Sequence, residues 1–432
     1  MAGSEDGGKV TFEEALNKAG FGLYSYLLVA LSGIVVIAVV CIAYSSTIII
    51  PTSACELETT SGQRGVLAAA PIVGLIIGAI LWGYLADVYG RKFTLLISLF
   101  SSATVNSLAS ISVNWIMLML LQFIATLLAS GQYSQAMTMV SESVPMAKRN
   151  LVVLLVGSIF LLSQGIMAAF AIPIVPLNFS YYLPSLGIYW NSWRTVLIVY
   201  SVPSIIAGLW LIFMQESPKY LFAKGREEEA IEILKKIHRL NHFSSQEEFL
   251  VKDIQIESTA STSSVSGRNQ ILPLFKAPLL KSTIILTTLY LLQHIGSFLV
   301  WLPTIANQVV EIFETGQSSN LTLCGMIHSG INAPVDPNVA PCSLNSTSLL
   351  LVLGVGAIQS VSNVIISLVI NRVGRRNMVM FVSAVCGISG IIVNLIPNAI
   401  GSLVFFLIFL IGIVSLGLYT AIAVALFPTS LR

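Results

Sequence analysis

Charged side chains stand close together where two apolar stretches of the chain meet, and their spacing favours ion pairs. Asp87 precedes Arg91 by four residues, one turn of a helix, so the two side chains can pair. Gly90 between them allows a tight turn. Glu142 and Arg149 offer a similar pair after a later apolar stretch. We expect a charge network that fastens helix ends together; the alternative is that these charges only anchor loops and set topology.

Residues that would support enzyme chemistry are missing from the sequence. It contains no phosphate-binding loop, no cluster with metal-ligand spacing and no nucleophile elbow. We therefore expect no enzyme activity, no cofactor and no metal site. No basic cluster with interleaved aromatic residues is present either, so nucleic acid is not an expected partner.

The composition requires an apolar solvent around most of the chain. Of the 432 residues, 55% are hydrophobic and only 10% are charged, whereas soluble domains carry roughly a quarter charged residues. The mean hydropathy is +0.86. A lipid bilayer is the partner that this composition demands, because it replaces water as the solvent of the apolar surface.

Ten apolar stretches are long enough to cross the roughly 30 Å hydrocarbon core of a bilayer. They cover residues 24–50, 65–85, 93–113, 115–140, 151–172, 193–214, 282–303, 348–370, 378–396 and 400–424, and Asn114 is the one clear polar break between the third and fourth. The sequence predicts an all-α polytopic membrane protein with a six-helix N-terminal half over 1–214, a cytoplasmic loop over 215–281 and a four-helix C-terminal half over 282–432. Residues 304–347 form the predicted external loop.

The basic residues set the predicted orientation. With the N-terminus in the cytoplasm, all of the 22 Lys and Arg except Arg64 and Arg194 lie on the inside. The segment before the first apolar stretch is acidic and lacks the basic region of a signal peptide, so we expect that stretch to be retained as a helix. The cytoplasmic loop contains Ile231, Leu234 and Ile237 at helical spacing, which predicts a short amphipathic helix over 225–240.

Three glycosylation tripeptides fall on the predicted outer side. They begin at Asn178, Asn320 and Asn345. Cys324 and Cys342 share one of these outer loops and can form a disulfide in an oxidising compartment. Cys55 also lies outside, so another pairing stays open.

Two motifs recur at almost the same offset, which indicates two homologous halves. Gly90 and Gly374 lie 284 residues apart in similar loops, and Pro145 and Pro428 lie 283 residues apart. The first half has six apolar stretches and the second has four. We therefore expect two further helices after Arg432 in a complete protein, with the chain being a fragment, a splice form or a shortened product.

These motifs resemble the major facilitator superfamily. The loop from Gly83 through Asp87 to Lys92 is similar to its signature cytoplasmic loop, and the run 215–221 is similar to a motif of its sugar and organic-ion branches. The segments 81–87, 192–194 and 300–303 resemble the synaptic vesicle glycoprotein 2 family. The chain departs from that pattern at several places, which are Val39, Ile42, Gln122, Asn371 and Ala425.

The resemblance implies a two-half helical bundle that works by alternating access, with a charge network formed by Gly83, Asp87, Gly90, Arg91, Lys92, Glu142, Pro145, Arg149, Glu216, Gly374, Arg375 and Arg376. It also places several polar and aromatic residues in helices that line a central cavity. These candidates for binding a substrate are Tyr44, Gln122, Gln164, His294, Trp301, Gln359, Asn363 and Tyr419. His294 and Trp301 are seven residues apart, so we expect them on one helix face. Each candidate can instead form hydrogen bonds between helices.

The apolar stretches contain no Asp, Glu, Lys or Arg in their middle parts, which argues against a simple proton-coupled mechanism. The sequence favours a carrier or facilitator of a small organic solute that is neutral or weakly charged. The alternative is a non-transporting membrane glycoprotein with an interaction or regulatory role. The plasma membrane and an intracellular vesicle are equally compatible locations.

Overall fold

The computed structural model describes residues 10–177, 179–242, 249, 251, 254–255, 275–277, 279–295, 298–315, 322, 324–325 and 344–426. The chain is mostly helical and divides into two compact units. Unit 1 comprises Met1–Ser46, Thr59–Ser163 and Ser180–Ser261, and unit 2 comprises Thr47–Glu58, Gln164–Phe179 and Thr262–Arg432.

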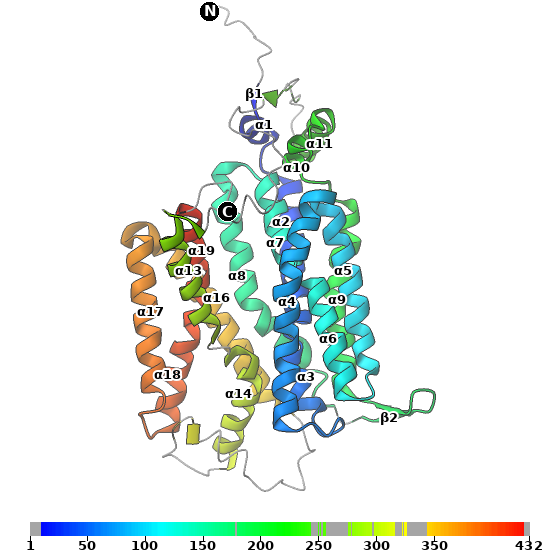
Figure 1. The fold of residues 1–432 in the computed structure, drawn as a ribbon, viewed down its shortest axis with the longest axis vertical. Helices are drawn as coiled ribbons and strands as arrows, with labels where there is room; N and C mark the ends of the chain where they lie inside the picture. Colours follow the sequence, from blue (N-terminus) through cyan, green and yellow to red (C-terminus); the bar gives the residue numbers. More distant parts are fainter. Residues whose placement is uncertain are drawn as a thin grey trace, which may run out of the picture. The chain divides into compact units, whose positions relative to one another are not determined.

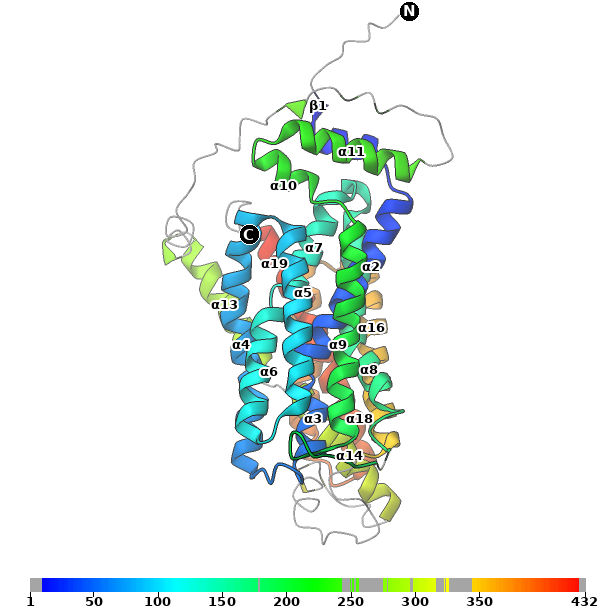
Figure 2. The ribbon, with the colours of Figure 1, turned by 90° about the vertical axis from the view of Figure 1, so that its right-hand side faces the viewer.

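Unit 1 is a bundle of long apolar helices. They are α2 (Leu23–Ala43), α4 (Ser61–Tyr89), α5 (Arg91–Leu108), α6 (Trp115–Ala129), α7 (Gln132–Ser143), most of α8 (Met146–Ala171) and α9 (Ser192–Phe213). Figures 1 and 2 show α4, α5, α6 and α9 running side by side, with α4 packed on α6 and α5 packed on α9. A short 3₁₀ turn, η1 (Ala109–Ile111), ends α5. The side chain of Asn114 then accepts the backbone N–H of Met117 at 2.8 Å and starts α6, at the break that the sequence predicts.

Three short amphipathic helices cover one end of this bundle. They are α1 (Phe12–Ala19), α10 (Pro218–Ala223) and α11 (Glu227–Asn241), and Figure 2 shows α11 lying across the bundle end beside α1. Ala230, Leu234 and Ile237 of α11 are buried. The amphipathic helix predicted over 225–240 is therefore present, and its apolar face packs against unit 1 rather than facing solvent.

Two small sheets belong to unit 1. β1 (Val10–Thr11) pairs in parallel with β4 (Ile254–Gln255). β2 (Tyr181–Leu183) and β3 (Ile188–Trp190) form an antiparallel hairpin between α8 and α9.

Unit 2 is also helical. Its elements are α3 (Ser46–Ser53) apart from the first residue, the end of α8, α13 (Leu279–Ile295), α14 (Phe298–Thr315), α16 (Ser346–Val373), α17 (Arg375–Ile392), α18 (Ala399–Ile411), η3 (Gly412–Val414) and α19 (Ser415–Leu426). Within it, α17 packs on α18, α14 on α16 and α13 on α19. Residues of α14, α16 and α18 form one apolar core, and residues of α17 and α19 form another.

The predicted class of polytopic helical membrane protein is confirmed. Nine helical segments of the described chain are long and apolar enough to cross a membrane, and a shorter apolar helix covers Leu279–Gln293. The bounds predicted for the seventh span, 282–303, are wrong: α13 ends at Ile295, and α14 runs on to Thr315 into the predicted external loop. The reason is that Leu302, Ala306 and Val309 repeat at helical spacing and are buried in the core of unit 2, which stabilises α14 across Pro303.

Candidate functional site

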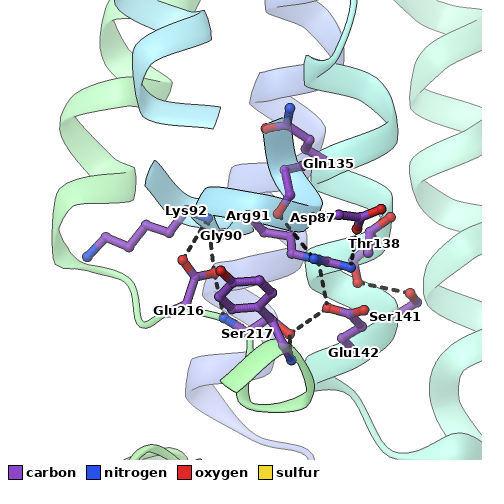
Figure 3. Close-up of polar contacts among 12 residues, drawn as sticks. Asp87, Gly90, Arg91, Lys92, Gln135, Thr138, Ser141, Glu142, Glu216 and Ser217 are labelled. Carbon is purple, nitrogen blue, oxygen red and sulfur yellow. Dashed lines mark hydrogen bonds and ion pairs between the residues drawn. The ribbon is translucent and has the colours of Figure 1, made fainter. Parts of the chain in front are cut away.

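The turn between α4 and α5 is tight because Gly90 adopts a left-handed backbone with φ of 103°. A Cβ atom here would lie 2.6 Å from a carboxylate oxygen of Glu216. That carboxylate accepts the backbone N–H of Lys92 at 3.0 and 3.2 Å (Figure 3). It thereby satisfies a free amide in the first turn of α5, where the helix dipole favours an acidic group.

Arg91 lies beside this turn and contacts two acidic side chains. Its guanidinium group is 3.2 Å from Asp87 and 3.4 Å from Glu142 of α7. The Asp87 side chain is 74% exposed and that of Glu142 only 13%, so water screens the pair with Glu142 far less. Arg91 also donates to the carbonyl oxygen of Ala86 at 3.2 Å and stacks over the ring of Tyr220. It thus joins α4, α7 and α10.

The segment before α10 completes the arrangement. The hydroxyl of Ser217 donates to Glu142 at 2.5 Å and accepts the N–H of Tyr220 at 3.1 Å, which caps α10. The hydroxyl of Tyr220 donates to the carbonyl of Val88 at 2.9 Å. Burial, and next the charge of Glu216, raise the pKa of Tyr220, so its hydroxyl keeps its proton and acts as a donor. We call Asp87, Arg91, Lys92, Glu142, Glu216, Ser217 and Tyr220 the Gly90 network.

Arg149 takes a different partner from the one its spacing suggests. It binds Glu13 of α1 at 3.1 Å, and Lys219 approaches the same carboxylate at 4.0 Å. Glu142, the neighbour in sequence, faces Arg91 and Ser217 instead. At the other end of α1, Asn241 of α11 donates to the carbonyl of Gly20 at 2.9 Å. The predicted pairing of Glu142 with Arg149 is therefore replaced by a bond that fastens α1 to α8.

The other predicted members of the charge network lie apart from it. Gly83 is exposed, and no heavy atom of the described residues lies within 4 Å of where its Cβ would be. Pro145 is buried between α7 and α8. In unit 2, Gly374 again has a positive φ, of 87°, and the following Arg375 and Arg376 are exposed.

The two binding candidates of unit 1 have different surroundings. Gln122 is 2% exposed, and both ends of its amide are engaged: it accepts the hydroxyl of Ser45 at 2.6 Å and donates to Asn106 at 3.1 Å. Tyr44 is half-buried at the end of α2. The geometry of Gln122 favours hydrogen bonding between helices over a free binding group.

The candidates of unit 2 are dispersed over several helices. Gln359 of α16 is buried and donates to the carbonyl of Leu410 at 3.0 Å. Tyr419 of α19 is buried against the ring of Tyr290 and lies 3.4 Å from the hydroxyl of Ser383. Asn363 of α16 and Gln164 at the end of α8 are half-buried.

His294 belongs to α13 and Trp301 to α14, and residues 296–297 between the two helices lie outside the described residues. Their placement on a common face therefore stays a prediction. Trp301 is 37% exposed, and the side chain of His294 lies outside the described part of the chain.

The fourth long helix of unit 1 is broken, and a corresponding break occurs in unit 2. α6 ends at Ala129 and α7 begins at Gln132, while α18 ends at Ile411 and η3 separates it from α19. The carbonyl of Leu127 accepts the indole N–H of Trp82 at 2.9 Å and the hydroxyl of Ser130 at 3.0 Å. The carbonyl of Leu410, 283 residues further on, accepts Gln359. Side chains thus supply partners for carbonyls at both breaks.

A polar stripe on α5 was missed from the sequence. It comprises Thr94, Ser98, Ser102 and Asn106, which are all buried and four residues apart. Thr94 donates to Gln135 at 3.1 Å, Ser98 to the carbonyl of Leu128 at 2.5 Å, and Gln132 donates to Ser102 at 2.8 Å. The regular four-residue spacing was the signal in the sequence that would have revealed it.

The structure corrects the predicted disulfide. Cys324 is an exposed free thiol, so its pairing with Cys342 is wrong, and Cys342 itself is outside the described residues. Cys55 is disulfide-bonded instead. Of the three glycosylation asparagines, Asn345 is exposed at the start of α16, where its side chain accepts the N–H of Thr347. Asn178 and Asn320 fall outside the described residues.

Within the described residues, no group of three or more His, Cys, Asp or Glu is arranged to hold a metal ion. The acidic residues of the Gly90 network bind Arg91 and backbone amides. Their arrangement joins the ends of α4, α5, α7 and α10.

Known proteins with similar sequences include members of the synaptic vesicle 2 group. Synaptic vesicle glycoprotein 2B from Mus musculus is 28% identical over 231 residues, which cover 53% of this chain and 34% of that protein. Synaptic vesicle 2-related protein from Bos taurus is 28% identical over 231 residues, 52% of this chain and 38% of that protein. The chain therefore matches about a third of the length of these relatives.

Solved structures share the fold at low sequence identity. The xylose transporter XylE from E. coli, in a partially occluded inward-open conformation, has a TM-score of 0.60 at 15% identity, covering 94% of this chain and 86% of that chain. A mutant of the nucleoside transporter NupG has a TM-score of 0.56 at 11% identity, covering 92% and 82%.

The family model described as Major Facilitator Superfamily matches residues 33–432, nearly the whole chain. This match agrees with the two repeated loops, the multi-pass helical fold and the solved transporters that share it. The chain therefore belongs to the Major Facilitator Superfamily, a family of membrane transporters and not of enzymes.

Proposed function

We propose that the protein carries a small organic solute, neutral or weakly charged, across a membrane by alternating access. The observation that carries the proposal is the Gly90 network, in which Arg91 binds Asp87 and Glu142 while Glu216 holds the first turn of α5. Alternating access requires helices of one half to move together. A network that fastens the ends of α4, α5, α7 and α10 makes unit 1 suited to move as one body.

The positions of charged residues support a neutral or weakly charged substrate. The spans of the sequence carry Asp, Glu, Lys and Arg only near their ends, whereas proton relays and ion sites usually use ionisable groups deep in the membrane. Two of the solved structures with this fold are named as transporters of xylose and of nucleosides, which are neutral organic molecules. The side chains that we propose for binding are the polar and aromatic candidates of the spans, since hydroxyl, amide and ring groups recognise such solutes. They are Tyr44, Gln122, Gln164, His294, Trp301, Gln359, Asn363 and Tyr419.

The membrane in which the protein works is proposed from its relatives. Their names place them in the synaptic vesicle group, so an intracellular vesicle is one candidate and the plasma membrane is the other. With the N-terminus in the cytoplasm, the Gly90 network would lie on the cytoplasmic side.

Uptake of radiolabelled solutes into proteoliposomes tests the proposal. A panel of sugars, nucleosides and small organic cations and anions is offered to the wild-type protein and to Asp87→Asn and Arg91→Ala. We expect saturable uptake of a neutral or weakly charged solute, and a loss of uptake in Arg91→Ala at an unchanged amount of folded protein. Arg376→Ala is the control, because Arg376 lies in the corresponding loop of unit 2 and is exposed.

Two results would contradict the mechanism. Unchanged uptake in Arg91→Ala would remove the network from the transport cycle. A parallel fall of uptake and of folded protein would assign the network to folding and topology alone.

A non-transporting glycoprotein is the second candidate. It is favoured by the amides of Gln122 and Gln359, which are buried and bonded within the bundle and so are engaged before any solute binds. Absence of uptake across the whole panel, by protein that is folded and inserted, would support this candidate over transport.

A further inference from the structure

The hairpin formed by β2 and β3 presents an aromatic surface that the transport proposal does not use. Tyr182 and Tyr189 are directly opposite each other on one face, with ring centroids 5.1 Å apart. They are 55% and 53% exposed, and Tyr181 and Leu186 are 67% and 44% exposed. From Phe179 to Trp193 the sequence has no Asp, Glu, Lys, Arg or His. An exposed surface of this kind marks an interaction site.

The hairpin has a defined shape. Gly187, with φ of 64°, closes the loop between the strands, and its N–H donates to the carbonyl of Leu183 at 3.0 Å. On the opposite face from Tyr182 and Tyr189, Ile188 is 4% exposed and faces the protein, while Tyr181 at the start of β2 shares that face and is 67% exposed. The pleat of the strands therefore presents the face of Tyr182 and Tyr189 outward.

A buried arginine fixes the hairpin to the bundle. Arg194, 1% exposed, donates to the carbonyl of Tyr189 at 3.0 Å and to those of Ser110 and Ser112 at 2.6 and 3.0 Å. The indole N–H of Trp190 donates to Thr195 at 3.1 Å. These bonds tie β3 to the start of α9 and to the end of α5, so the aromatic face is held in place rather than free to fold away.

The position of the hairpin relative to α9 indicates what covers it. α9 has 22 residues, about 33 Å at 1.5 Å per residue, which matches the hydrocarbon core of a bilayer. Three of its side chains, Val202, Ile206 and Leu209, are 41%, 48% and 52% exposed, so α9 presents an apolar surface along its length. The hairpin directly precedes α9, and in Figures 1 and 2 it extends sideways at the end of the helix instead of continuing along the helix axis.

We propose that the hairpin over residues 181–190 is an interfacial anchor that lies on the lipid headgroup layer of the bilayer spanned by α9. Tyrosine and tryptophan favour this layer because the ring is apolar and the polar tip can stay hydrated. The hairpin directly precedes a helix of membrane-spanning length whose exposed side chains are apolar, and this continuity favours lipid as what covers the hairpin. The anchor would fix the depth of unit 1 in the membrane.

Site-directed spin labelling in phosphatidylcholine nanodiscs tests this proposal. A nitroxide is placed at Leu186→Cys in a Cys324→Ser background, since Cys324 is exposed and would also react. Collision rates with membrane-soluble oxygen and a water-soluble nickel chelate are compared. Ile206→Cys on α9 is the lipid control, and Lys235→Cys on α11 is the aqueous control.

We expect the ratio of oxygen to nickel collisions at position 186 to be several-fold above that at position 235 and below that at position 206. Tyr182→Ser with Tyr189→Ser should shift the ratio at position 186 toward the aqueous value. A ratio equal to that of position 235 overturns the proposal. Protection from both reagents also overturns it, because it would show that protein and not lipid covers the hairpin.

Discussion

The turn at Gly90 in unit 1 and the turn at Gly374 in unit 2 have similar backbones and different surroundings. Their φ and ψ angles are 103° and 157°, and 87° and 144°. At Gly90 the space of a Cβ atom is occupied by the carboxylate of Glu216, whereas at Gly374 no heavy atom of the described chain lies within 4 Å of that space. The two turns therefore share the glycine, and among the described residues the close contact with a carboxylate is found at Gly90 and not at Gly374.

The sequence difference between the two loops agrees with this contrast. Asp87 and Glu142, which bind Arg91, correspond to Asn371 and Ala425 in the repeat. Neither of the latter can offer a carboxylate to an arginine. One repeat thus retained acidic groups for holding helix ends together, and the other retained the turn and its basic residues.

The largest loss of stability is expected from substituting Gly90 or Gly374. Alanine at either position costs about 1–3 kcal/mol of stability, because a positive φ combined with an extended ψ is a backbone conformation that normally only glycine adopts. Gly90→Ala additionally forces the carboxylate of Glu216, the flexible end of its side chain, to move aside, which adds a smaller loss of stability. Thermal unfolding in detergent should therefore place Gly90→Ala below Gly374→Ala.

Comparing the two glycine variants also separates the cost of backbone strain, which both share, from the cost of the contact with Glu216, which only Gly90→Ala has. Glu216→Ala in the Gly90→Ala background removes the atoms that collide and should recover part of the lost melting temperature. Equal destabilisation by Gly90→Ala and Gly374→Ala would show that the contact with Glu216 contributes nothing.

A smaller loss of stability is expected from neutralising Glu142, the partly buried acid that faces Arg91. Glu142→Gln keeps the shape of the side chain but removes the charge that faces Arg91, and hydrogen bonds to charged groups contribute about 1.5–3 kcal/mol. A double-mutant cycle with Arg91→Ala isolates the pairwise term. Additive effects of the two substitutions would contradict a direct interaction.

The control for that cycle is Arg376→Ala in unit 2. Arg376 is exposed, and surface substitutions usually change stability by about 0.5 kcal/mol or less. A loss at Arg376 as large as that at Glu142 would remove the distinction between the two loops.

The membrane helices and the Asp87–Arg91 pair were predictable because they depend on local periodicity and spacing. The partner of Arg149 was not. Its nearest acid in sequence is Glu142, yet it binds Glu13, 136 residues away, because α1 folds back against the bundle. Tertiary packing decided this partner, and local sequence does not encode it. The seventh span was misplaced because Pro303 reads as a helix end, although Leu302, Ala306 and Val309 repeat at helical spacing and their burial sustains α14 through the proline.

An intermediate loss of stability is expected at the two helix breaks, between α6 and α7 in unit 1 and between α18 and α19 in unit 2. Gln359→Leu removes the side-chain donor of the Leu410 carbonyl, which should cost about 0.5–1.5 kcal/mol. Ser130→Ala should cost less, because the carbonyl of Leu127 keeps the indole N–H of Trp82. Thermal unfolding of the two variants checks this order, and a larger loss in Ser130→Ala would contradict it.

The smallest loss of stability is expected from breaking an exposed ion pair on α11. Lys236 and Glu232 are 2.9 Å apart, closer than Arg91 and Glu142, yet their side chains are 49% and 64% exposed. The hydrogen bond from Lys236 lowers the pKa of Glu232. Stability from this shift is present above the ordinary pKa of glutamate and is lost as the pH falls through the lowered value. Lys236→Ala should raise the pKa of Glu232 toward its ordinary value, as NMR titration would show.

At neutral pH the same substitution should leave the melting temperature unchanged, because water screens an exposed pair and the side chains lose entropy in forming it. Glu142→Gln is the opposite case, in which a longer contact is shielded from water. If Lys236→Ala destabilised the protein as much as Glu142→Gln, distance rather than burial would determine the strength of these pairs. The Gly90 network would then have no energetic advantage over the exposed charges of α11.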